Sequence, residues 1–250
     1  MPKIYIFEHA NRLFVEDYFL HSFKYSAVLA YFMYVAGIDE AGRGPAMGPM
    51  AMAIVSVKKS DEFKLRTMGV KDSKKLSAKK REELAVVIRD IGRSKVVLID
   101  AKEVDKAVLS PSDNLNWLEA RKSAELVNMV NPDQIVFDCP STNLESYKQY
   151  IKNKIKKKKM KILVEHKADE NHLTAAAASI LAKVSRDAEI EKIKKKIKKD
   201  FGSGYASDPK TQAFIEKYWE KKEYQKYFRQ SWETLKRRKD AKKQRSLDDF

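Results

Sequence analysis

Acidic residues follow apolar segments at two places in the sequence, where their carboxylates could hold metal ions. Asp39 and Glu40 come directly after the apolar run that begins near Met33, and Asp138 closes the run QIVFD at 134–138. A carboxylate at a strand end inside a folded sheet is costly unless a positive charge compensates it. Mg²⁺ prefers carboxylate oxygens, and two such ions about 3.5–4 Å apart can stabilise the attacking and leaving oxygens of a phosphoryl displacement. The pattern indicates metal-assisted phosphodiester chemistry, although spacing alone favours the alternative that these acids are solvated turn residues.

The overall charge fits an acidic pocket on a basic surface. The 250 residues carry a formal net charge of +16, and 43% of them are apolar. That apolar fraction suffices for a core and excludes a wholly disordered chain. A single cysteine, Cys139, excludes a disulfide scaffold and a multi-cysteine zinc site, and suits a cytoplasmic protein. The strongly basic surface predicts a polyanionic partner, either nucleic acid or an anionic membrane face.

No segment is long and apolar enough to predict a membrane span. The longest uncharged run has 14 residues, at 25–38, and a spanning helix needs about 20. We therefore expect no membrane insertion.

Strand-like and helix-like segments must position the acids. Apolar runs predict five strands, near 33–38, 50–57, 95–100, 134–138 and 161–165. Helical patterns occupy 77–91, 111–130, 143–159, 173–199 and the basic stretch 208–239. Few helical residues separate the early strands, whereas the later strands alternate with helices. This order predicts a mixed sheet with an antiparallel start and a parallel finish.

The N-terminal segment differs from the rest of the chain. Residues 1–34 contain 10 of the 25 aromatic residues, with no clean period. We favour the interpretation that Met33 is the natural start, and the alternative is an amphipathic arm packed on the domain. The resulting division is an extension (1–32), a catalytic domain (33–200), a helical C-terminal region (201–240) and a tail (241–250).

A glycine-rich turn follows the first pair of acids. In the segment 37–45, glycines flank Arg43 on both sides. Glycine allows positive φ and a close approach of the backbone, so N–H groups can face a phosphate or a sugar hydroxyl. The segment superficially looks like a dinucleotide fingerprint, but Pro45 and Pro49 exclude the helix which that motif requires.

Five segments occur in an order that is highly specific. They are GIDEAGRGPAMGPM (37–50), KDSKKLS (71–77), HKAD (166–169), AAASILAKVSRD (176–187) and GSGYASDPKT (202–211). Together they resemble ribonuclease HII (type 2 ribonuclease H) in its archaeal-like form, over about residues 33–215. The resemblance implies an α/β, ribonuclease H-like fold: a five-stranded mixed sheet flanked by helices, with a helical C-terminal region. It also implies an endonuclease that hydrolyses the RNA strand of RNA–DNA hybrids and nicks duplex DNA 5′ to an embedded ribonucleotide.

The resemblance assigns the catalytic and metal-binding roles to four acids. They are Asp39, Glu40, Asp138 and Asp169. Two Mg²⁺ or Mn²⁺ ions are implied in the active complex, with Asp39 bridging them. The motif gives His166 and His172 no metal role, so we expect them to be ordinary packed or surface residues.

The resemblance also implies substrate-binding residues in three segments. They are Gly42, Arg43 and Gly44 in the turn, Lys71, Ser73 and Lys74 in the next motif, and Tyr205. The turn would contact the 2′-hydroxyl, the local feature that separates RNA from DNA. Tyr205 would stack on the following deoxyribose. The alternatives are a packed aromatic at Tyr205 and a solvated charge run at 71–74.

The last seven residues contain a spaced Gln, Leu and Phe. Gln244, Leu247 and Phe250 resemble a sliding-clamp (PCNA) binding box, in which a short segment sets apolar side chains into a groove. Phe250 is the last residue of the sequence, so a second adjacent aromatic is missing and weaker binding is expected. The alternative is a disordered basic tail.

Two other classes of protein share some of these features. A nucleic-acid-binding module without activity would keep the charge and the aromatics but not need all four acids. A junction resolvase would share the carboxylates but not need the Gly-Arg-Gly turn or Tyr205. Lysine runs at 152–161 and 192–199 are solvated helix faces or duplex contacts. A monomer is expected.

Overall fold

Five strands form one mixed sheet in the computed structural model, which describes residues 32–70 and 76–248. The strand order is β3-β2-β1-β4-β5. Their bounds are β1 (Tyr34–Ala41), β2 (Met50–Lys58), β3 (Arg93–Ile99), β4 (Gln134–Asp138) and β5 (Lys161–Glu165). β1–β2 and β2–β3 are antiparallel, whereas β1–β4 and β4–β5 are parallel. The predicted mixed sheet is confirmed.

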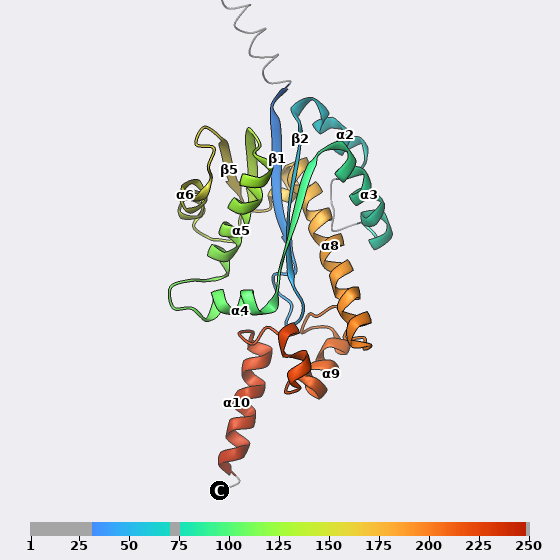
Figure 1. The fold of residues 1–250 in the computed structure, drawn as a ribbon, viewed down its shortest axis with the longest axis vertical. Coiled ribbons are helices and arrows are strands. Elements are labelled where there is room, and N and C mark those ends of the chain that lie inside the picture. Colours follow the sequence, from blue (N-terminus) through green and yellow to red (C-terminus); the bar gives the residue numbers. More distant parts are fainter. Residues whose placement is uncertain (1–31, 71–75, 249–250) are drawn as a thin grey trace, which may run out of the picture.

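Helices cover both faces of the sheet (Figure 1). The α-helices are α2 (Glu62–Thr67), α3 (Ala78–Ile91), α4 (Ala101–Leu109), α5 (Leu115–Val130), α6 (Leu144–Lys154), α7 (Ala168–Asn171), α8 (Leu173–Ile197), α9 (Pro209–Tyr218) and α10 (Glu233–Asp248). Two 3-10 helices lie at Lys59–Asp61 and Lys222–Tyr227. No helix in the described ranges is long and apolar enough to cross a membrane.

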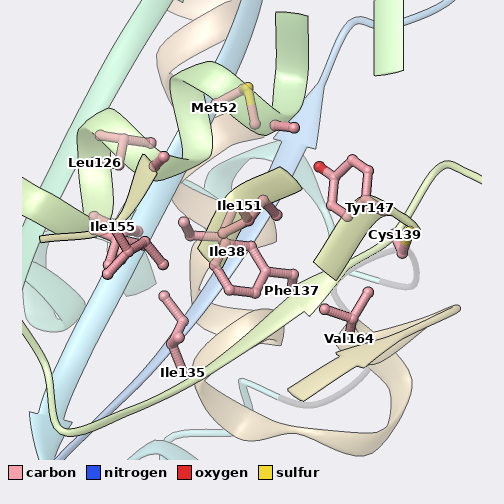
Figure 2. Close-up of a cluster of buried hydrophobic side chains, with 14 of the residues drawn as sticks. Ile38, Met52, Leu126, Ile135, Phe137, Cys139, Tyr147, Ile151, Ile155 and Val164 are labelled. Atoms are coloured by element: carbon pink, nitrogen blue, oxygen red, sulfur yellow. The ribbon is translucent and has the colours of Figure 1, made fainter. Parts of the chain in front are cut away.

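The two faces of β1 pack against different helices. Ala36 and Ile38 belong to the core that includes α5 and α6 (Figure 2), whereas Val35 belongs to the core that includes α3 and α8. This alternation is the period of two of a β-strand. On the α8 side, a Cβ added at Gly37 would lie 2.2 Å from the backbone nitrogen of Ala175. Glycine therefore permits the close contact between β1 and α8.

Side-chain caps decide where several helices begin. Ser77 caps α3 through a hydrogen bond from the Lys80 N–H (3.2 Å), as its sequence predicts. The predicted start of α5 at 111 is wrong, because Asn114 accepts from the Trp117 N–H (3.0 Å) and the helix begins at Leu115. The predicted helix 143–159 ends at residue 154. Helix α4 was not expected from the sequence pattern.

The C-terminal region is not the continuous helix predicted at 208–239. Aromatic residues of α9, the second 3-10 helix and its end form a separate core that includes Phe214, Tyr224 and Phe228. Packing these rings together requires the chain to turn, and Phe228 forms a β-bridge with Met47 next to the glycine turn. Helix α10 then extends to residue 248, beyond the predicted end, because 233–248 contains no Gly or Pro.

Candidate active site

Parallel pairing of β1 and β4 brings two of the four acids together. Ile38 pairs with Phe137, and both side chains lie in the core shared with α5 and α6. Asp39 and Asp138, one residue further along each strand, therefore point to the α8 face. Asp39 is buried, with 5% of its surface exposed.

The third acid, Asp169, comes to the same face through α7. The Asp138 carboxylate accepts a hydrogen bond from the Ala168 N–H (3.1 Å), which fixes the start of α7 against the end of β4. Asp169 is the next residue and is buried. The segment HKAD (166–169) follows β5 directly, and it places the Asp169 carboxyl group near the ends of β1 and β4.

Glu40 points to the opposite face of β1, where it meets an acid that the sequence analysis missed. Glu119 of α5 is 1% exposed, and its charge raises the pKa of Glu40. Burial is the largest cause of that shift, which brings the pKa of Glu40 to about 8. Burial also raises the pKa of Glu119 to about 7, opposed by the guanidinium of Arg43.

The buried acids repel one another, and this repulsion indicates that a bound cation would stabilise their ionised forms. Burial raises the pKa of Asp39 well above its usual range, and the charges of Glu40 and Asp138 raise it further. A divalent cation would relieve this repulsion, and carboxylate oxygens are its preferred ligands. Within 32–70 and 76–248, no three acidic, histidine or cysteine side chains already form a metal cage. Mg²⁺ needs only one or two carboxylates besides waters and substrate phosphates, so the donor set fits it.

The glycine turn after β1 is hydrogen-bonded to the C-terminal region. Gly42 has φ 81°, and a Cβ there would lie 2.1 Å from the Arg186 side chain. The buried guanidinium of Arg229 donates to the carbonyl oxygens of Gly42 (2.6 Å) and Arg43 (2.7 Å). The indole N–H of Trp232 donates to the carbonyl of the third turn residue, Gly44 (2.9 Å).

Tyr205 lies beside this turn and lines a pocket. A Cβ at Gly44 would lie 3.8 Å from its ring, and the Arg186 guanidinium lies 5.3 Å from the ring centroid. The Tyr205 side chain is 40% exposed. The pocket, of about 480 Å³, is lined by Glu40, Ala41, Gly42, Arg43, Gly44, Arg81, Lys183, Arg186, Asp187 and Tyr205. Glu40, the Gly-Arg-Gly turn and Tyr205 therefore line the same pocket.

Comparison with known proteins identifies the family. The ribonuclease HII family model matches residues 36–235. This chain belongs to the ribonuclease HII family. It is 44% identical over 207 residues to the ribonuclease HII of Methanococcus maripaludis, covering 81% of this chain and 85% of that protein. Membership makes it a ribonuclease H, an endonuclease acting on the RNA of RNA–DNA hybrids.

Two solved structures share the fold at close to 40% identity. The crystal structure of ribonuclease H2 from Pyrococcus horikoshii has a TM-score of 0.74 and 38% identity, and the match covers 82% of this chain and 96% of that one. The PCNA–ribonuclease HII complex from Archaeoglobus fulgidus matches with a TM-score of 0.73 and 39% identity, covering 81% and 96%. The ribonuclease H-like fold expected from the sequence is confirmed.

Several residues assigned from the family resemblance lie outside the described part of the chain. Residues 1–31 of the predicted extension (1–32) and the segment with Lys71, Ser73 and Lys74 are not described, nor is Phe250 or the side chain of Leu247. Gln244 is an exposed residue of α10. The roles suggested for these residues stay predictions.

The two histidines near the acids have protein partners. The His166 Nδ1 lies 3.0 Å from the Cys139 carbonyl oxygen, and the His172 Nε2 lies 2.9 Å from a carboxylate oxygen of Glu165. His166 is exposed and His172 is half-buried, and the expectation that neither histidine has a metal role stays a prediction.

Four residues around this ribonuclease HII site were not found by sequence reasoning. They are Asn116, Glu119, Lys183 and Arg229. Lys183 donates to the Ser179 hydroxyl (2.7 Å), and Ser179 in turn hydrogen-bonds Asp39 and lowers its pKa. Asn116 and Glu119 are polar residues three apart on one face of α5, the only local pattern that could have drawn attention to them.

Proposed function

We propose that this ribonuclease HII nicks duplex DNA on the 5′ side of a single embedded ribonucleotide, in addition to cutting the RNA of hybrids. The observation that carries the proposal is the shared pocket of Glu40, the Gly-Arg-Gly turn and Tyr205. An enzyme that must recognise one ribose within DNA needs its 2′-hydroxyl contacts next to the reacting phosphate.

The turn is suited to read the 2′-hydroxyl through its backbone. The carbonyls of Gly42 and Arg43 are bonded to Arg229. Because the C=O and N–H of a planar trans peptide point in opposite directions, the N–H groups of Arg43 and Gly44 are directed away from Arg229. Tyr205 would then pack its exposed ring on the next deoxyribose, which has no 2′-hydroxyl to clash with it.

Asp39, Glu40, Asp138 and Asp169 would hold two divalent cations, either Mg²⁺ or Mn²⁺. When bound, these cations supply Lewis-acid stabilisation for in-line hydrolysis of the phosphodiester, which leaves a 5′-phosphate. Asp39 and Asp138 face this centre from neighbouring strands, Asp169 from α7 and Glu40 from the side of the turn. Lys183 orients Ser179 on Asp39, and so holds that carboxylate in one position.

The catalytic unit would comprise residues 33–200, completed by the helical region 201–240. Tyr205 and Arg229 both belong to that region and both lie against the turn. We propose that the protein acts as a monomer in the cytoplasm.

The test is cleavage of a labelled DNA duplex that contains one ribonucleotide, with Mg²⁺ or with chelator, by the wild type and by Asp39→Asn. The expected result is a metal-dependent nick 5′ to the ribonucleotide that Asp39→Asn abolishes. Binding without cleavage in Mg²⁺ would support a binding module instead. Cleavage of all-DNA junctions would support a resolvase.

We also propose that the C-terminal end binds a sliding clamp. The support is the Gln244, Leu247 and Phe250 spacing together with the 39% identical Archaeoglobus fulgidus protein, whose structure is a complex with PCNA. Leu247→Ala with Phe250→Ala should weaken the affinity for an archaeal clamp at least about tenfold and leave cleavage without the clamp unchanged. An unchanged affinity, measured by surface plasmon resonance, would end this proposal.

A further inference from the structure

The side chain of Arg43 in the glycine turn is hydrogen-bonded to α5, the helix on the face of the sheet opposite to α8. One guanidinium nitrogen donates to the Glu119 carboxylate, and the other donates to the Asn116 side-chain oxygen (2.8 Å). Both acceptors lie on α5, one turn apart. The two ends of the guanidinium fork are thus engaged by the protein, in a geometry that Arg adopts and Lys cannot reproduce.

Burying the Glu119 carboxylate at this position costs free energy, so we expect it to have a functional role. It is almost completely buried, and its second carboxylate oxygen has no hydrogen-bond partner among the described residues. It also lies close enough to Glu40 to oppose the ionisation of that acid. A buried ion pair is weak evidence for stability, because desolvation of the two charges offsets their attraction. Its place beside the acids is better explained by positioning.

The turn is consequently clamped from two sides. Arg229 holds the backbone carbonyls of Gly42 and Arg43, whereas Glu119 and Asn116 hold the Arg43 side chain. The backbone clamp fixes the orientation of two peptide groups of the turn, and the side-chain clamp fixes the position of Arg43 relative to α5. That position sets where the N–H groups of the turn lie relative to Glu40 in the pocket.

We propose that Glu119 is a positioning residue that acts through Arg43, and that it holds the turn where the turn can bind the 2′-hydroxyl at the cleavage site. The inference rests on the proposed reading of that hydroxyl by the turn. The Arg43 side chain accordingly connects the turn to α5, and its guanidinium does not bind a phosphate of the substrate. Phosphate contacts elsewhere on the basic surface supply most of the binding.

The test compares Glu119→Ala, Glu119→Gln, Arg43→Ala and the double variant Glu119→Ala/Arg43→Ala on duplex DNA with one ribonucleotide. Glu119→Ala should lower kcat about 10- to 100-fold, since a misplacement of about 1 Å can cost up to about 100-fold, with little change in KM. Glu119→Gln keeps an oxygen acceptor for Arg43 and should retain most of the activity. In the Arg43→Ala background, removing Glu119 should cause no further loss.

A matched control comes from the same helix. Glu125 of α5 is exposed and pairs with Lys122 (3.5 Å) away from the site, so Glu125→Ala should stay within about twofold of the wild type. Melting temperatures of all variants show whether each is folded. The Mg²⁺ concentration for half-maximal activity measures any direct effect of the Glu119 charge on the acids.

Each outcome has one meaning. If Gln behaves like Ala, or if the losses from Glu119→Ala and Arg43→Ala multiply, Glu119 acts through its charge rather than through Arg43, and the inference is overturned. If Arg43→Ala cleaves like the wild type, its side chain does not position the turn and the present inference fails, while the backbone reading by the turn stands. If the wild type does not cut the single-ribonucleotide duplex, the proposed reading fails first. If Arg43→Ala is impaired and Glu119→Ala is not, only the present inference fails.

Discussion

Arg229 and Arg43 are 186 residues apart in the chain, yet the guanidinium of the first donates to the carbonyl oxygen of the second at 2.7 Å. The same guanidinium reaches the carbonyls of Gly42 (2.6 Å) and Gly48 (3.2 Å). Arg229 is fully buried, and burial lowers its pKa to about 10. It therefore joins the C-terminal region to the turn that completes the pocket.

Replacing Arg229 should damage stability and activity together. Arg229→Met leaves buried carbonyls without donors, which costs at least about 3 kcal/mol. In a domain of this size that lowers Tm by about 6–12 °C. Arg229→Lys should recover only part of the loss, since one ammonium cannot reach all three carbonyls. Calorimetry measures the change, and a Tm within about 2 °C of wild type for Arg229→Met would contradict it.

The burial of Glu40, together with the charge of Glu119, predicts a pH dependence of stability without metal. The folded-state pKa of Glu40, about 8, exceeds its usual value, so the folded protein holds this proton more tightly than the unfolded chain. The resulting stabilisation is complete below about pH 4.5 and is lost as pH rises through about 8. Glu40→Gln cannot ionise.

The measurement is Tm in chelator from pH 5 to 8.5 for the wild type and Glu40→Gln. The Tm advantage of Glu40→Gln over the wild type should widen by at least about 2–4 °C, the shift that 1 kcal/mol produces. Added Mg²⁺ should narrow it again, because the cation offsets the charge. A difference that stays constant across this pH range would rule out Glu40 as the group responsible.

Gly37 should not tolerate even a methyl group. A Cβ there would lie 2.2 Å from the backbone nitrogen of Ala175 and 2.5 Å from the carbonyl carbon of Thr174. Gly37→Ala must push α8 away from β1 and so displace Asp39, two residues along. We expect a loss of several kcal/mol and of cleavage.

Gly69→Ala is the control for that substitution. A Cβ at Gly69 has open space, although its φ is 75°. Only backbone strain of about 1–2 kcal/mol is therefore expected. Equal losses at both glycines, measured by chemical denaturation, would mean that contact with α8 is not the cause.

Tyr205 should contribute to cleavage with little effect on stability, because its ring is partly exposed. Tyr205→Ala removes a stacking surface of about 1–3 kcal/mol, and should lower kcat/KM on a single-ribonucleotide duplex about 5- to 150-fold. Tyr205→Phe keeps the ring and should lose only the hydroxyl contribution. Steady-state kinetics with Tm as a folding check tests this, and a Tm loss as large as the activity loss in Tyr205→Ala would indicate a packing role.

The local parts of the fold could be predicted because they depend on local patterns. The strands 134–138 and 161–165 have the predicted bounds, since an apolar run limited by turn residues encodes a buried strand. The Ser77 cap of α3 is equally local. By contrast, 208–239 reads as one helix by composition, and only packing of its aromatic rings around Phe214 shows why it turns.

For the site, the sequence by itself determined which acids end which strands, and its motifs identified the family. Only the tertiary structure decided what holds those acids and the turn. The parallel register of Ile38 and Phe137 puts Asp39 and Asp138 on one face. Glu119 and Arg229 contact Arg43 across 76 and 186 positions of the chain. The physical reason is that periodicity and caps act over a few residues, whereas buried hydrogen bonds between distant segments exist only once the sheet and helices have packed.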